Sequence, residues 1–122
     1  MSSASRHVVL LVEDEPLIRL DTSMILEDAG YDVLEASNAL QALAALERHP
    51  EIEILFTDIN MPGPMDGLEL AHRVHAAWPA VRLVVTSGKI PLAQAAIPNA
   101  GAFIAKPYSP EAVARVMSRV LN

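Results

Sequence analysis

VVLLVEDEP, residues 8–16, is the most informative stretch of this chain. Residues 8–12 are all valine or leucine, and such an uninterrupted apolar run is typical of a parallel-sheet strand whose two faces are both covered. Acidic residues follow at once, and Pro16 then stands where the first turn of a helix tolerates a proline. The stretch therefore predicts a buried strand, an acidic turn and the start of a helix.

Four more apolar runs are candidate strands, at residues 32–36, 52–57, 81–86 and 102–105. Helical patterns lie between them, and the first of these carries its apolar residues at Leu17, Ile18, Leu20, Met24 and Ile25, before Gly30. The later helices have candidate N-caps in Ser37 or Asn38, Asp66 and Ser109.

This alternation predicts an α/β fold, a three-layer, doubly wound sandwich around a five-stranded parallel sheet. We expect the flavodoxin-like strand order 2-1-3-4-5. Pro91 and Pro98 bracket the segment between the last two candidate strands, so we expect the fourth helix to be short or irregular.

The composition restricts the class of function. The 122 residues are 52% apolar, which fits one folded domain over residues 1–122 whose residues 1–6 form a flexible polar lead. A net charge of −6 argues against direct nucleic-acid binding, which usually needs a basic face. The absence of cysteine excludes thiol catalysis and cysteine-ligated metals. Because no apolar run could span a membrane and no secretion signal opens the chain, we expect a cytoplasmic protein without membrane contact.

The candidate site lies where the strands end, because doubly wound sheets bind ligands beyond the carboxyl ends of their strands. The residues at these ends are acids, hydroxyls and one lysine, namely Glu13, Asp14, Glu15, Asp58, Asn60, Thr86, Ser87 and Lys106. Carboxylates from neighbouring strands repel each other, and a hard divalent cation such as Mg²⁺ removes that repulsion.

Glu13, Asp14 and Asp58, with a backbone carbonyl near Asn60, are the candidate metal ligands. A lysine and a hydroxyl at the same edge are suited to hold an anion beside the metal. Such a set is the equipment of phosphoryl transfer, with a carboxylate as nucleophile. From the residues alone the prediction is an anion or metal site.

Four segments resemble the receiver domain of bacterial two-component response regulators: VVLLVEDEP (8–16), ILFTDINMPGPMDGLEL (54–70), VVTSGK (84–89) and AFIAKPYSP (102–110). Each motif is weak alone, but all of them in this order and spacing are specific. The resemblance extends over about residues 7–121. It implies a single-domain regulator like those of chemotaxis, or the receiver of a hybrid histidine kinase.

The resemblance implies that Asp58 accepts a phosphoryl group from a sensor histidine kinase or a histidine phosphotransfer domain. By the same carry-over, Glu13, Asp14, Asp58 and the carbonyl of Asn60 hold Mg²⁺, for which Mn²⁺ is a possible substitute. The protein is then no enzyme in the ordinary sense, since it catalyses only its own phosphorylation and dephosphorylation.

The resemblance also implies that Lys106 pairs with the phosphoryl group and that Thr86 moves toward it. Phe103 then turns into the space that Thr86 leaves, and this switch changes the surface that an unknown downstream protein reads. The segment before Lys106 is two residues shorter than is common in the family, and Pro64 is an extra residue beside Asp58. Pro64 should change its loop but spare Asp58. The shortened segment, with Pro91 and Pro98, makes the output surface unusual, so we expect a monomer or a weak dimer.

Two other functions are alternatives. A receiver-like binding module that is never phosphorylated is the first, and the complete set of acids, threonine and lysine argues against it. A small-molecule hydrolase is the second. Asn60 cannot do acid–base work two residues after a nucleophilic aspartate, so a phosphatase of that type is disfavoured.

Overall fold

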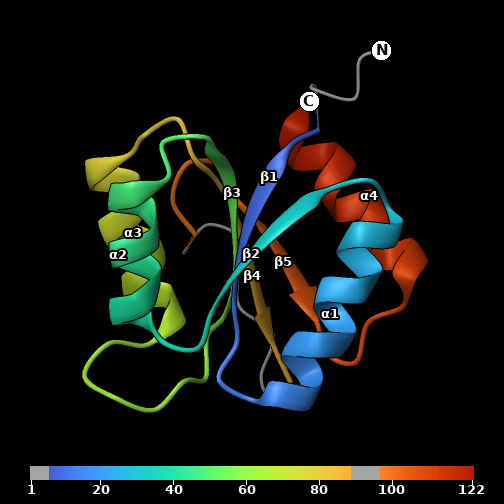
Figure 1. The fold of residues 1–122 in the computed structure, drawn as a ribbon, viewed down its shortest axis with the longest axis horizontal. Coiled ribbons are helices and arrows are strands. Elements are labelled where there is room, and N and C mark those ends of the chain that lie inside the picture. The colour runs from blue at the N-terminus through green and yellow to red at the C-terminus, as the bar shows by residue number, and fades with distance from the viewer. Residues whose placement is uncertain (1–5, 89–96) are drawn as a thin grey trace.

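The computed structural model describes residues 6–88 and 97–122 as a sandwich of three layers (Figure 1). The elements in chain order are β1 (Val8–Val12), α1 (Pro16–Asp28), β2 (Asp32–Ala36), α2 (Ala39–Arg48), β3 (Ile52–Asp58), α3 (Gly67–Ala77), β4 (Arg82–Ser87), β5 (Ala102–Ala105) and α4 (Pro110–Leu121). All strands are parallel, in the order β2-β1-β3-β4-β5, which confirms the predicted fold.

Two predicted features fall wholly or mainly outside this description. Residues 1–5 of the expected lead are not among the described residues, whereas Arg6 is, and it donates hydrogen bonds to the carbonyls of Gly30 and Tyr31, both at 3.1 Å. The expected short fourth helix falls mostly on residues 89–96, which also lie outside the described residues. Among the helices that are described, none is long and apolar enough to cross a membrane.

The helices begin where the sequence supplies caps. Asn38 accepts a hydrogen bond from the backbone of Gln41 at 2.8 Å, so it is the cap of α2 rather than Ser37. Asp66 caps α3 and Ser109 caps α4, as predicted. These side chains satisfy backbone N–H groups that have no partner within the helix.

The sheet divides the core in two because successive strand residues face opposite sides. Leu10, Leu55 and Val85 pack with the cluster under α2 and α3. Val9 and Phe56 pack with the cluster under α1 and α4. The uninterrupted apolar runs therefore reflect burial on both faces, as β1 predicted.

The turn directly before β5 is held by hydrogen bonds and by an unusual backbone conformation. Asn99 and Ala100 both have left-handed backbone angles, with φ of 58° and 51°. The Asn99 side chain donates to two carbonyls of the loop before β4, at 3.3 and 3.2 Å. A Cβ atom at Gly101 would lie 2.9 Å from the carbonyl oxygen of Leu83, so only glycine fits there. This turn brings the chain into β5 although the segment before Lys106 is two residues shorter than is common in the family.

Candidate functional site

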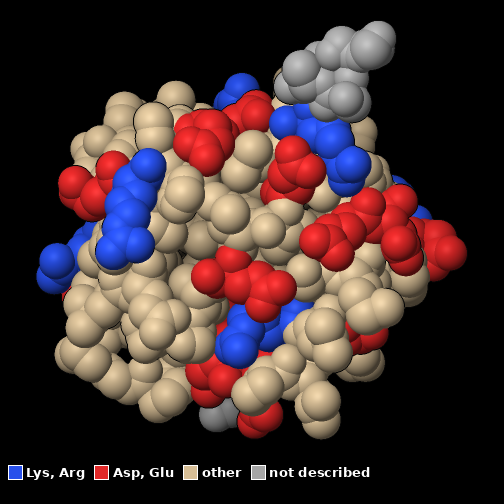
Figure 2. Space-filling view, viewed as in Figure 1, with Lys and Arg blue, Asp and Glu red and all other residues tan. Residues whose placement is uncertain are grey.

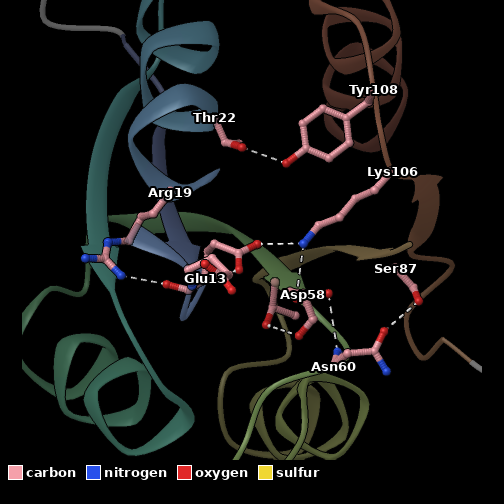
Figure 3. Close-up of polar contacts among 10 residues, drawn as sticks. Glu13, Arg19, Thr22, Asp58, Asn60, Ser87, Lys106 and Tyr108 are labelled. Atoms are coloured by element: carbon pink, nitrogen blue, oxygen red, sulfur yellow. Dashed lines mark hydrogen bonds and ion pairs between the residues drawn. The ribbon is translucent and has the colours of Figure 1, made fainter. Parts of the chain in front are cut away.

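The carboxyl edge of the sheet gathers the side chains that the strand ends predicted (Figure 3). Glu13 follows β1, Asp58 ends β3 and Lys106 follows β5. The register places Asp58 directly opposite Thr86 of β4. A parallel sheet brings these positions together because all its strands end at one edge.

Three carboxylates form a compact cluster. Ligand oxygens of Glu13, Asp14 and Asp58 all lie within 4.8 Å of one another. Glu13 and Asp58 are buried, and Asp14 is half-buried. Acids this close repel each other unless positive charge compensates them. The donor set consists of carboxylate oxygens only, and it therefore fits a hard divalent cation such as Mg²⁺.

Lys106 supplies part of that positive charge. Its Nζ lies 2.8 Å from Oε1 of Glu13 and 3.2 Å from Oδ2 of Asp58. Burial acts to lower the pKa of Lys106, but hydrogen bonds and charges from both carboxylates outweigh it and raise the pKa above 10.5. The ammonium therefore stays charged at neutral pH.

At Glu13 the effect of burial on the pKa outweighs that of the neighbouring charges and hydrogen bonds. Burial raises the pKa of its carboxyl above the ordinary value of 4.5, although the Lys106 hydrogen bond opposes this. Its second oxygen accepts a hydrogen bond from the backbone N–H of Glu15 at 3.1 Å. Both oxygens of this buried acid are thus engaged, which fixes its orientation at the edge of the sheet.

Asn60 lies beside the predicted acceptor. Its backbone N–H donates to Oδ1 of Asp58 at 3.3 Å. Its side-chain oxygen accepts a hydrogen bond from the Ser87 hydroxyl at 2.8 Å. The loop after β3 is therefore tied both to the carboxylate of Asp58 and to the end of β4.

The two predicted switch residues lie on neighbouring strands. Thr86 is buried at the end of β4, and its register partner on β5 is Ile104. Phe103 lies one position earlier, opposite Val85, and is half-buried against the cluster under α2 and α3. Their proximity is compatible with a coupled movement, and the movement itself stays a prediction.

A sequence comparison identifies the family to which this fold belongs. The sequence model of the response regulator receiver domain matches residues 9–118. The chain belongs to the response regulator receiver family.

Relatives of this receiver domain include proteins of different architecture. A chemotaxis protein CheY homolog from Campylobacter jejuni is 30% identical over 120 residues, which cover 93% of this chain and 92% of the relative. Sensor kinase CckA from Brucella abortus is 33% identical over 118 residues, 93% of this chain but 12% of the kinase. A receiver protein structure from Sinorhizobium medicae matches with a TM-score of 0.87 at 28% identity, over 98% of this chain and 97% of that one.

The predicted family, fold and general function are thereby confirmed. Receiver domains are signalling modules of two-component systems rather than classical enzymes, and they interact with histidine kinases or phosphotransfer proteins. They bind Mg²⁺ at an acidic pocket, and this receiver has a Glu/Asp/Asp cluster at the corresponding edge.

The sequence did not predict three residues that shape this receiver's site. Arg19 of α1 donates from Nη1 to the carbonyl oxygen of Glu13 at 2.7 Å and so holds the acidic turn. Gly67 begins α3 against the end of β3, where a Cβ atom would overlap the carbonyl oxygen of Asp58. Only the Asp-Gly pair at the helix start was available as a signal for Gly67, and nothing in the pattern marked Arg19.

Tyr108 is the third such residue. Its hydroxyl lies 2.7 Å from the Thr22 hydroxyl of α1. Its ring packs against that of Phe56 in a T-shaped arrangement, at a centroid distance of 6.0 Å and an interplanar angle of 78°. Burial raises the pKa of Tyr108, so the phenol stays protonated at neutral pH. The contact joins residues far apart in the sequence, which no local pattern marks.

Proposed function

We propose that this receiver domain accepts a phosphoryl group on the carboxylate of Asp58 and signals through a change in protein–protein contact. The donor is the phosphohistidine of a sensor kinase or of a histidine phosphotransfer domain. One observation carries the proposal: the Lys106 ammonium lies 3.2 Å from Oδ2 of a buried aspartate at the edge of the sheet. A buried acceptor with a charged donor beside it is suited to hold a transferred phosphoryl group.

The transfer itself requires no proton from the protein. An oxygen of Asp58 forms the new bond to phosphorus as the bond between phosphorus and the imidazole nitrogen breaks, and the electron pair stays with the imidazole. Lys106 moves its hydrogen bonds from the carboxylates to a phosphoryl oxygen. After transfer the negative charge lies on the phosphoryl group rather than on the Asp58 carboxylate, and the ammonium neutralises it there. Thr86, level with Asp58 in the register, offers a hydroxyl to a second oxygen.

Glu13, Asp14 and Asp58, with the backbone carbonyl of Asn60, are the proposed ligands of Mg²⁺ or its substitute Mn²⁺. The ion supplies positive charge that reduces repulsion between the acceptor and the phosphoryl oxygens. Hydrolysis of the product follows the same geometry. A water oxygen bonds to phosphorus, the bond to Asp58 breaks with its electron pair returning to the carboxylate, and both water protons leave with the phosphate as H2PO4⁻.

The signal leaves the site through Thr86 and Phe103, which we propose to move together on phosphorylation. A downstream protein reads the change on the face formed by the end of β4, β5 and α4. On the face drawn in Figure 2, Lys and Arg side chains are interspersed with Asp and Glu, which supports a protein partner rather than nucleic acid. We place the domain in the cytoplasm as a monomer or weak dimer.

The test is the intact mass of the protein after incubation with Mg²⁺ and acetyl phosphate. We expect one added phosphoryl group in the wild type and none in Asp58→Asn or without the metal. Asp66→Asn is the matched control, because it also removes one carboxylate but keeps a side chain that caps α3. It should be phosphorylated like the wild type.

Rapid hydrolysis could hide the adduct, so the same proteins are titrated with beryllofluoride, a stable mimic of the phosphoryl group. Binding in the wild type and not in Asp58→Asn supports the proposal. Failure of the wild type to bind beryllofluoride and to take up phosphoryl would overturn it in favour of a binding module that is not phosphorylated.

A further inference from the structure

We propose that Tyr108 is a positioning residue for phosphoryl transfer, held by Thr22 and acting through Lys106. The inference rests on the proposed function of Asp58 and Lys106. Tyr108 stands two residues after Lys106, in the loop at residues 106–109 between β5 and α4. In Figure 3 its ring reaches from this loop toward α1, while the Lys106 side chain extends from the same loop to the acids.

The loop needs an anchor because space lies beside it. A pocket of about 500 Å³, open to solvent, lies between α1 and this loop, with Leu17 and Ile18 on the helix side and Lys106 and Pro107 on the loop side. Side chains that border an open pocket have no protein neighbours on that side, so packing alone fixes the loop poorly there. The hydrogen bond between Thr22 and Tyr108, at 2.7 Å, crosses between the same two elements.

The hydrogen bond between the two hydroxyls is expected to add little to the stability of the fold, which favours a role in positioning the loop. Thr22 is buried, and Tyr108 packs against the apolar cluster under α1 and α4. A buried hydroxyl is costly unless it is bonded, and replacing both partners by apolar groups of similar shape is often nearly neutral. A Phe and Val pair would fill this space about as well. What the hydrogen bond adds is a fixed position of the loop relative to α1.

The position of the loop matters because the Lys106 ammonium must reach two carboxylates at once. Its Nζ lies 2.8 Å from Glu13, which follows β1, and 3.2 Å from Asp58, which ends β3. The ring of Tyr108 packs in a T-shaped contact with Phe56, which precedes Asp58 by two residues on β3. Tyr108 thus relates the loop that carries the lysine to both α1 and the strand that carries the acceptor. A small shift of the loop would displace the ammonium from the phosphoryl oxygen.

The experiment measures the rate constant of phosphorylation by acetyl phosphate at saturating Mg²⁺, together with the thermal unfolding midpoint. Tyr108→Phe and Thr22→Val each remove one side of the bond. We expect each to slow phosphorylation roughly three- to tenfold, the effect of one hydrogen bond on a barrier. The double variant should be no slower than either, and Thr22→Ser, which keeps the hydroxyl, should react like the wild type.

Two controls separate positioning from general stability. Tyr31→Phe removes the other tyrosine hydroxyl, at the opposite end of α1, and should leave the rate unchanged. Lys106→Met provides a background in which the lysine is absent. There Tyr108→Phe should cause no further slowing, because a residue that acts through Lys106 has nothing left to position.

Several results would overturn the inference. These are an unchanged rate in Tyr108→Phe and Thr22→Val, an equal slowing in the Lys106→Met background, or loss of the folded state in both single variants. If Tyr108→Phe alone fails to fold, Thr22→Val tests the same bond from the other side. A wild type that takes up no phosphoryl group would instead overturn the proposed function, and this inference with it.

Discussion

The two edges of the sheet each hold a contact between a basic and an acidic side chain, and the two contacts have nearly the same length in opposite environments. At the carboxyl edge, Lys106 lies 2.8 Å from Glu13, with side chains 17% and 3% exposed. At the amino edge, His7 lies 2.9 Å from Glu53, with side chains 46% and 45% exposed. Distance therefore does not distinguish the two pairs, but burial does.

Burial changes what each pair contributes. An exposed pair is screened by water and salt, and typically contributes about 0–1 kcal/mol. A buried pair has lost the solvation of both charges, and its mutual attraction often does no more than offset that loss. The carboxyl-edge pair is therefore a poor way to stabilise the fold. Under the proposed function its value is chemical, because the Lys106 ammonium would transfer its hydrogen bonds to an incoming anion.

The sharpest test of this contrast is Lys106→Met. We expect phosphorylation by acetyl phosphate to slow by roughly a hundredfold or more, the usual cost of losing one charge-stabilising group. Because Lys106 and the metal compete for the same carboxylates, the variant should also bind Mg²⁺ more tightly in calorimetric titration. Weaker Mg²⁺ binding in the variant would contradict this account of the site.

Gly67→Ala tests how closely the carboxyl edge is packed. The new Cβ would overlap the Asp58 carbonyl, so the backbone must move, and we expect a loss of about 2–3 kcal/mol in the free energy of unfolding. Gly88→Ala is the matched control, because its Cβ would meet Lys106 at an ordinary 3.7 Å. Denaturant unfolding should separate the two variants, and equal losses would show that the overlap is relieved without cost.

The pH dependence of Mg²⁺ binding follows from Glu13. Because burial raises its pKa above 4.5, the folded site takes up a proton at a higher pH than an ordinary glutamate, and the metal must displace that proton. Affinity should therefore fall as the pH is lowered from 7 through the raised pKa, approaching about tenfold per unit below it. Calorimetry between pH 7 and 5 measures this, and Glu13→Gln should flatten the dependence. A slope equal in both proteins would assign the proton to another group.

Glu53→Gln should have the smallest effect. Removing the exposed partner of His7 is expected to change the free energy of unfolding by less than about 0.5 kcal/mol and to leave phosphorylation unchanged. The same kinetic assay and denaturant titration apply. A slowing of more than about twofold would mean that the two edges are coupled and that the contrast between them is too simple.

The residues at the carboxyl edge could be predicted because a topological rule places them. Once β1 and β3 are read as neighbouring parallel strands, Glu13 and Asp58 must meet, whatever their side chains do. The lysine after β5 follows by the same reasoning. What the rule does not supply is the contact partner of each atom, such as the bond from Arg19 to the backbone of Glu13.

The orientation of α1 could not be predicted for a physical reason. Its apolar residues lie all around the helix, so periodicity does not select one face. In the structure Leu17, Leu20 and Met24 are 80%, 56% and 54% exposed, whereas Thr22 and Ser23 are buried. The contact between Thr22 and Tyr108 was hidden for this reason, since a polar residue on a helix is expected to face water.

Trp78 ends α3 at the amino edge and is the only tryptophan of the chain. It lines a hollow there together with His7 and Arg82, across the sheet from the acids. The indole ring is thus remote from the proposed metal site, and its fluorescence should not change when an ion merely occupies that site. A change in emission on phosphorylation would instead report a rearrangement that has travelled the length of the strands. Trp78 is therefore an intrinsic fluorescent probe of whether phosphorylation changes the structure at the amino edge of the sheet.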